Sequence, residues 1–216
     1  MTTITLDPAK TYEEEDLGNI VLMEHVNVRI PDQQIGTLFY FVALGLTRDP
    51  HMMVGTENMW ANAGEQQFHL PTRGTDVLRG HIGVVVGSLR ALKQRCEMVA
   101  PKLAGTKFAF EDADGYMKLT CPWGNEFHVF EPSEKWNGLE LGVPYVEFTV
   151  PVGTAEGIAR FYHAALQAPA TVGEENGAKV TTVSVGRYQQ LRYKETTAAI
   201  PEYDAHHIDR KSTRLN

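Results

Sequence analysis

The chain has 216 residues, of which 43% are hydrophobic and 22% charged, and its formal net charge is -7. These values are ordinary for a globular protein and exclude the collagen-like, disordered and coiled-coil classes. Acidic residues outnumber basic ones, and no run of basic residues occurs. This argues against nucleic acid or an anionic membrane surface as a partner. The two cysteines, Cys96 and Cys121, are too few for a disulfide framework and favour buried thiols in a reducing compartment.

Residues 1–22 are predicted to form an N-terminal extension. An acidic cluster from Glu13 to Asp16 lies where a targeting peptide would have basic residues followed by an apolar run. No apolar stretch of the chain reaches membrane-spanning length. We therefore expect a cytoplasmic protein.

The chain then repeats one layout three times. Residues 24–46 read EHVNVRIPDQQIGTLFYFVALGL, which predicts a strand of alternating character, a Pro-Asp turn and a helix. The same order of strand, turn and helix returns at residues 80–99 and 144–168. Short extended segments follow each helix, so the repeating unit is βαβββ. A fourth unit begins at residues 203–208.

These repeats predict an α+β fold of paired βαβββ modules, in which a cupped mixed sheet carries its helices outside. We expect two modules to form one complete domain and a third module to begin an incomplete one. The predicted segments are a first domain at 23–133 with modules 23–75 and 79–132, a linker at 134–142, and an incomplete second domain at 143–208. The last eight residues, 209–216, read DRKSTRLN, which resembles the translation of a sequencing-library adapter.

Four histidines fall in register when the modules are aligned. His25 and His81 lie on the opening strands of modules one and two, and His69 and His128 lie on their closing strands. Because strand side chains alternate between faces, His25 shares its face with Asn27 and Arg29, and His128 shares its face with Glu126. We expect these polar faces to line a common cleft.

The sequence resembles the vicinal oxygen chelate superfamily, which includes glyoxalase I, extradiol dioxygenases and bleomycin resistance proteins. The βαβββ repeats carry this resemblance, together with the opening Gly80-His81-Ile82 and the closing Trp123-Gly124-Asn125 followed by alternating apolar residues. It implies one divalent metal ion (Fe, Zn, Ni or Mn) in a cupped sheet, bound by one residue from each opening and each closing strand. Carried over to this chain, the ligands are His25, His69, His81 and His128. The resemblance also allows a homodimer.

The chain departs from the pattern of its relatives, which commonly have glutamate at the position of His128 and often at that of His69. Four neutral imidazoles would leave the full charge of the ion on the site and favour an oxygen-chelating substrate. Such a set could also form a closed tetrahedral zinc site without chemistry, or an octahedral site with two open positions. In module three, the corresponding positions hold Tyr145 and Arg192, so no metal is expected there.

Two functional hypotheses follow from the resemblance. The first is a metal-dependent enzyme acting on a small oxygen-chelating substrate, with a dioxygenase or lyase favoured over an isomerase because no ligand carboxylate is available to move a proton. Glu126 is the candidate base, and the candidate substrate-binding residues are Arg29, Asn27, Gln67 and Trp60. The alternative is a non-catalytic, drug-sequestering binding protein of the bleomycin-resistance type.

Overall fold

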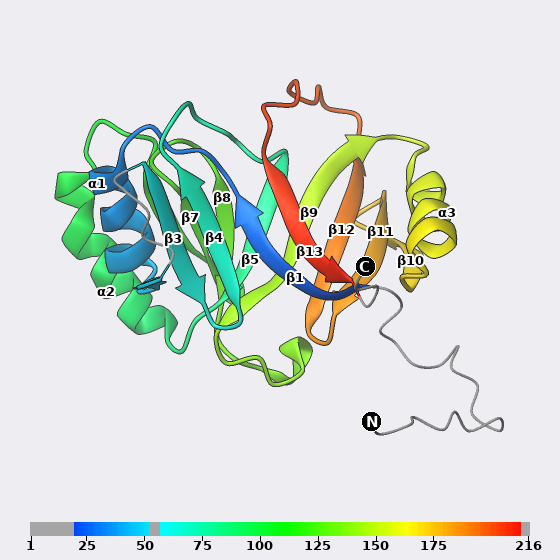
Figure 1. Ribbon diagram of the computed structural model, residues 1–216, viewed down its shortest axis with the longest axis horizontal. Helices are drawn as coiled ribbons and strands as arrows, with labels where there is room; N and C mark the ends of the chain where they lie inside the picture. The colour runs from blue at the N-terminus through cyan, green and yellow to red at the C-terminus, as the bar shows by residue number, and fades with distance from the viewer. Residues whose placement is uncertain (1–19, 52–56, 213–216) are drawn as a thin grey trace.

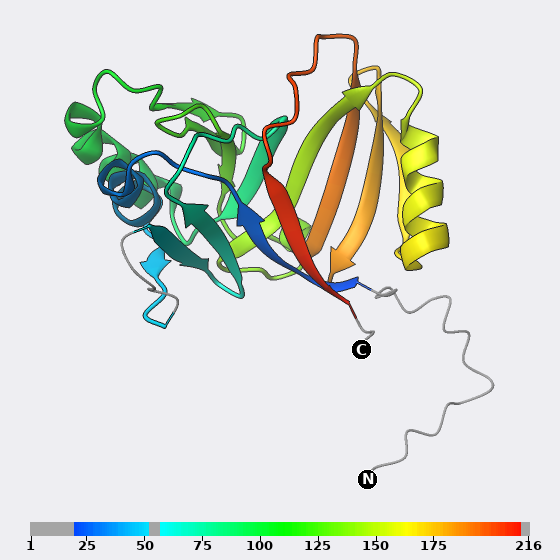
Figure 2. The same ribbon diagram turned by 45° about the horizontal axis from the view of Figure 1, so that its top comes forward.

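A computed structural model describes residues 20–51 and 57–212 of the chain. It is an α+β fold of two mixed sheets, as the repeats predict. The helical segments are α1 (Gln33–Gly36), η2 (Thr37–Ala43), α2 (Leu89–Val99), η3 (Ala100–Lys102), η4 (Glu134–Trp136) and α3 (Ala155–Leu166). Figures 1 and 2 show α1 and α2 together at one end of the molecule and α3 at the other end.

Each module contributes four strands in the same spatial order. Its opening strand pairs in parallel with its closing strand, and the two middle strands follow outward by antiparallel pairing. Module one contains β1 (Ile20–Asn27), β2 (Thr47–Arg48), β3 (Asn58–Ala63) and β4 (Gln66–Pro71). Module two contains β5 (Gly80–Val85), β6 (Ala109–Ala113), β7 (Tyr116–Thr120) and β8 (Glu126–Phe130). Module three contains β9 (Gly142–Pro151), β10 (Ala170–Glu175), β11 (Ala178–Gly186) and β12 (Gln189–Thr196).

The sheets group the modules differently from the predicted domains. Modules two and three form one eight-stranded sheet, because β5 pairs antiparallel with β9, whereas module one lies in a separate five-stranded sheet. The predicted linker at 134–142 therefore joins two halves of one sheet. All opening strands carry the same alternating pattern, so the repeats alone do not specify which opening strand pairs with which.

One edge of the five-stranded sheet is β13 (His207–Ser212), which pairs antiparallel with β1. Figure 1 shows β1 and β13 side by side between the two groups of helices. This strand includes the first residues of the tail that resembles an adapter, since Asp209 pairs with His25.

The strands alternate as the sequence predicts. On β1 and its extension, Val26, Val28 and Ile30 are at most 1% exposed and point into the core. The core is one continuous apolar cluster contributed by both sheets. The ring centroid of Phe39 lies 5.2 Å from that of Phe127, which joins η2 to the eight-stranded sheet. One core therefore supports the two polar faces that carry the histidines.

Candidate functional site

The four histidines lie in two separate pairs and do not converge on one point. His81 and His128 lie on the adjacent strands β5 and β8 of the eight-stranded sheet, and their rings stack with centroids 3.8 Å apart. His25 and His69 lie on β1 and β4 of the five-stranded sheet, with ring centroids 5.7 Å apart. The expectation of one four-histidine site is corrected by the sheet assignment, because module two pairs with module three and not with module one.

A cavity of about 1320 Å³ lies over the histidine-bearing face of the eight-stranded sheet. His81 and His128 line it, together with Tyr145 and Glu147 of β9 and Arg192 of β12. The intervening residues Ile82, Phe127 and Val129 point to the opposite face and are fully buried. We call this space the central cavity.

Tyr145 projects toward both histidines of the central cavity. Its hydroxyl oxygen lies 3.0 Å from Nε2 of His81 and 3.5 Å from Nδ1 of His128. Burial raises the pKa of Tyr145 above its usual range, which keeps the hydroxyl protonated as a hydrogen-bond donor. Gly83 makes room for this ring, because a Cβ atom at position 83 would lie 2.3 Å from it.

His81 is held in its neutral form. Burial, followed by the neighbouring His128, lowers the pKa of His81 from 6.5 to about 3. Its Nδ1 lies 3.7 Å from a carboxylate oxygen of Glu147, and this favours the tautomer with the proton on Nδ1. Nε2 of His81 is then left as the acceptor, which is the form of imidazole that binds a metal ion.

Carboxylates lie on both sides of the His81–His128 pair. Glu126 accepts a hydrogen bond of 2.9 Å from Nε2 of His128 and forms an ion pair with Lys118, and the bond to His128 is the main cause that lowers the pKa of Glu126 to about 2. On the other side, Arg192 donates from Nε to Glu147 at 3.0 Å and from Nη2 to Glu175 at 2.6 Å. The charge of Arg192 is thus already compensated by the protein.

His81, His128 and Glu126 fit a metal ion. One ligand atom from each lies within 4.8 Å of the other two. Two imidazoles and one carboxylate form a donor set used by first-row divalent metals. In the present arrangement, the ring nitrogens contact a phenol and carboxylates, groups that can themselves rearrange around a cation.

His25 and His69, the other pair of histidines, are less suited to binding a metal ion. His69 stacks on Trp60 with centroids 3.9 Å apart, and its two ring nitrogens contact the side-chain amides of Asn27 and Asn58 at 2.5 and 2.6 Å. Burial lowers the pKa of His69 to about 4. Neutral amides of this kind fix a ring but add little to the binding of a transition metal. On the same strand as Asn27, His25 forms a second cluster with the carboxylates of Glu24 and Asp209.

The predicted substrate-binding residues lie away from the central cavity, on the five-stranded sheet or its extension. Asn27 and Trp60 contact His69 as described, and Gln67 donates hydrogen bonds to Asn62 and Asp49. Arg29 donates from its backbone nitrogen and from Nε to the fully buried carboxylate of Asp76, at 2.9 and 2.7 Å. The guanidinium of Arg29 is therefore paired with a carboxylate of the protein itself.

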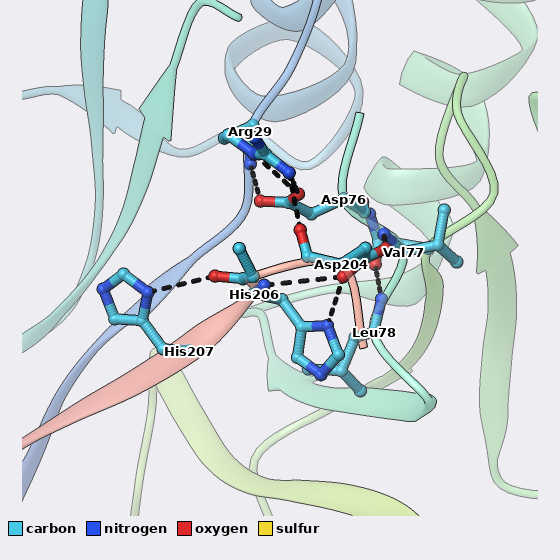
Figure 3. A network of polar contacts seen from close by, with 9 residues as sticks. Arg29, Asp76, Val77, Leu78, Asp204, His206 and His207 are labelled. Atoms are coloured by element: carbon cyan, nitrogen blue, oxygen red, sulfur yellow. Dashed lines mark hydrogen bonds and ion pairs between the residues drawn. The ribbon is translucent and has the colours of Figure 1, made fainter. Parts of the chain in front are cut away.

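Figure 3 shows the network around Arg29. Nη2 of Arg29 also donates to the backbone oxygen of Asp204, whose carboxylate in turn accepts from the backbone nitrogen of Val77 at 2.6 Å. The other carboxylate oxygen of Asp204 contacts Nδ1 of His206 at 2.6 Å. These contacts attach the segment before β13 to the connection between modules one and two.

The sequence named His81 and His128 as candidate ligands and Glu126 as a candidate base, and it gave no site role to Tyr145, Glu147 or Arg192. Tyr145 and Arg192 were recognised only as the module-three equivalents of histidines in module one. Glu147, two residues beyond Tyr145 on the same strand face, pairs directly with His81 across β5 and β9. The alignment of module three with the other modules could have pointed to these residues. It did not, because the sequence does not show that module three pairs with module two.

The chain has the vicinal oxygen chelate fold, which the βαβββ strand order and the eight-stranded sheet define. No protein-family model matches the sequence, and no curated protein does. Among solved structures, glyoxalase I from Zea mays superposes with a TM-score of 0.60 at 15% identity, covering 91% of this chain and 74% of that chain. A Bacillus subtilis protein assigned as a dioxygenase has a TM-score of 0.55 at 13% identity, covering 91% of this chain and 69% of that chain.

Within residues 20–51 and 57–212, no helix is long and apolar enough to cross a bilayer.

Proposed function

We propose that the protein is a metal-dependent enzyme that binds a small substrate through vicinal oxygen atoms in the central cavity. The observation that carries the proposal is the convergence of His81, His128 and Glu126 within 4.8 Å at a large cavity. Two imidazoles with one carboxylate are also the donor set of non-haem iron(II) oxygenases. This donor set favours a dioxygenase over a lyase. Because Glu126 would supply a ligand carboxylate, the expected lack of one no longer argues against an isomerase.

A bound divalent cation would supply positive charge that polarises the substrate oxygen atoms. The chain's own residues would position those atoms. The Tyr145 hydroxyl, 3.0 Å from Nε2 of His81, can turn to donate a hydrogen bond to a substrate oxygen. Arg192 holds Glu147 at 3.0 Å, so that Glu147 stays beside Nδ1 of His81 and keeps that ring in its ligand tautomer.

Metal titration of the purified chain tests the proposal. Iron(II), added without oxygen to metal-free protein, should bind at one site per chain. His81→Ala, His128→Ala and Glu126→Gln should each weaken binding by more than about tenfold. His69→Ala, on the other sheet, is the matched control and should leave the affinity unchanged. Equal losses from His69→Ala and His81→Ala would contradict the assignment of the site.

Activity is tested with the loaded protein. Oxygen consumption is measured with a panel of aromatic and aliphatic 1,2-diols. Uptake that depends on iron, and that is lost in His81→Ala, would support a dioxygenase. Tight metal binding without oxygen uptake would favour a lyase or an isomerase.

A non-catalytic binding protein is the second candidate, and one observation favours it. Nε2 of His81 and both nitrogens of His128 already have protein partners at hydrogen-bond distance. A ring satisfied in this way needs no ion. If the purified chain binds neither iron(II), zinc nor manganese, while the cavity still takes up ligands, the binding protein is the correct description.

A further inference from the structure

Aromatic side chains form one wall of the central cavity beside the histidines. Tyr116, Phe130, Trp136 and Tyr145 all line it. The centroid of Phe130 lies 5.4 Å from that of Tyr116 and 4.7 Å from that of Trp136. Trp136 stacks on Tyr145 at 5.8 Å. This wall, which we call the aromatic wall, adjoins the proposed metal site because the Tyr116 ring lies 4.6 Å from that of His128.

The connection between modules two and three completes this wall. The short 3-10 turn η4 carries Trp136 and places the ammonium of Lys135 over two rings, 4.5 Å from the centroid of Trp136 and 5.2 Å from that of Phe130. Lys135 is exposed, lines the cavity and has no carboxylate within ion-pair distance in the described part of the chain. The segment predicted to be a linker is therefore part of the binding surface.

The charge of the cavity differs from that of the whole chain. The chain carries a net charge of -7, whereas the cavity lining holds slightly more cationic than anionic side chains. Arg192 is already neutralised by Glu147 and Glu175. Lys135 is then a cation available to a ligand at the edge of the aromatic wall.

We infer that the ligand of this cavity is an aromatic carboxylate, whose ring lies against Trp136 and Phe130 and whose carboxylate contacts Lys135. A flat ring gains more from these faces than a saturated ring of similar size. The carboxylate gains a charge-assisted hydrogen bond from the ammonium. This inference rests on the proposed function only in placing the substrate in the central cavity.

Binding to the metal-free 216-residue chain tests the inference. Saturation-transfer NMR is measured with three probes: benzoate, benzamide, which keeps the ring without the charge, and cyclohexanecarboxylate, which keeps the charge without the aromatic ring. Benzoate should bind with a Kd of about 1 mM, as expected for a fragment of this size. Each of the other two probes should bind about fivefold more weakly.

Variants of Lys135 and Trp136 test the role of each residue in binding. Lys135→Gln should weaken benzoate about fivefold and change benzamide less than about twofold, because only benzoate has the charge that Lys135 recognises. Trp136→Leu should weaken both probes about fivefold, and Trp136→Phe should restore them. Lys102→Gln, an exposed lysine outside the cavity, is the control and should change neither.

The inference fails if cyclohexanecarboxylate binds as tightly as benzoate, if Lys135→Gln and Lys102→Gln have equal effects, or if benzoate does not bind at about 10 mM. These outcomes are independent of the metal titration. Metal binding without benzoate binding would overturn the ligand class and leave the proposed function standing. Benzoate binding without metal binding would overturn the proposed enzyme function and leave an aromatic carboxylate as the ligand.

Discussion

At the scale of single residues, the same side-chain type serves different purposes in the two sheets. His81 faces Tyr145 and a carboxylate, whereas His69 is fixed between two amides and stacked on an indole. Sequence register makes His81 equivalent to His25 and His128 equivalent to His69, and only the neighbours in space distinguish the histidines of the two modules. Tyr145 and Glu147 come from β9, which is distant in sequence from His81. Residue type and spacing therefore named His81 and His128 as candidate ligands without showing that they lie apart from His25 and His69.

Arg29 was predicted to bind substrate, and its contacts instead predict an effect on stability. Asp76→Ala should lower the free energy of unfolding by about 3 kcal/mol, because it removes a fully buried carboxylate that accepts two hydrogen bonds from Arg29. Urea denaturation measures this loss. Asp112→Ala, which breaks an exposed ion pair with Lys93, should change stability little. A similar loss in both variants would contradict the structural role of Asp76.

The buried thiol of Cys96 should make the stability of the protein fall with pH in the alkaline range. Burial raises the pKa of the Cys96 thiol from 9.0 to about 12. Ionisation above pH 9 therefore favours the unfolded chain, and the stability that comes from keeping this thiol neutral is complete below pH 9 and lost as the pH rises toward 12. Urea midpoints measured from pH 8 to 11 should fall more steeply for the wild-type chain than for Cys96→Ala. Parallel curves would show that Cys96 does not contribute.

At the scale of elements, the antiparallel pair of β5 and β9 joins two modules, and Gly80 permits their close approach. Gly80 has a φ of +145°, and a Cβ atom there would lie 1.9 Å from the backbone oxygen of Glu147. Gly80→Ala should therefore destabilise the protein by about 2 to 4 kcal/mol. Gly87 follows the same strand, has open space around it and is the matched control, for which Gly87→Ala should change stability by less than about 0.5 kcal/mol. Thermal unfolding compares the two.

The buried face of each strand was well predicted from the sequence, whereas the pairing of strands between modules was not. The alternation of Val26, Val28 and Ile30 fixes which face of β1 is buried, since period-two patterning depends only on local geometry. The pairing of Ile82 with Val146 is a contact between modules, and apolar residues of this kind would fit any opening strand. The strand order within a module could thus be inferred from the repeat, while the order between modules required the structure.

At the scale of the molecule, the continuous core predicts one cooperative unfolding transition. Phe39 and Tyr40 of module one contact Phe127 of module two, so separating the sheets would expose large apolar rings on both sides. Trp60 lies in the five-stranded sheet and Trp136 between the halves of the eight-stranded sheet. Fluorescence of single-tryptophan variants that retain one or the other should report the same urea midpoint as circular dichroism. Separate midpoints would show that the sheets unfold as independent units, and the predicted domain boundaries would then need to follow the sheets.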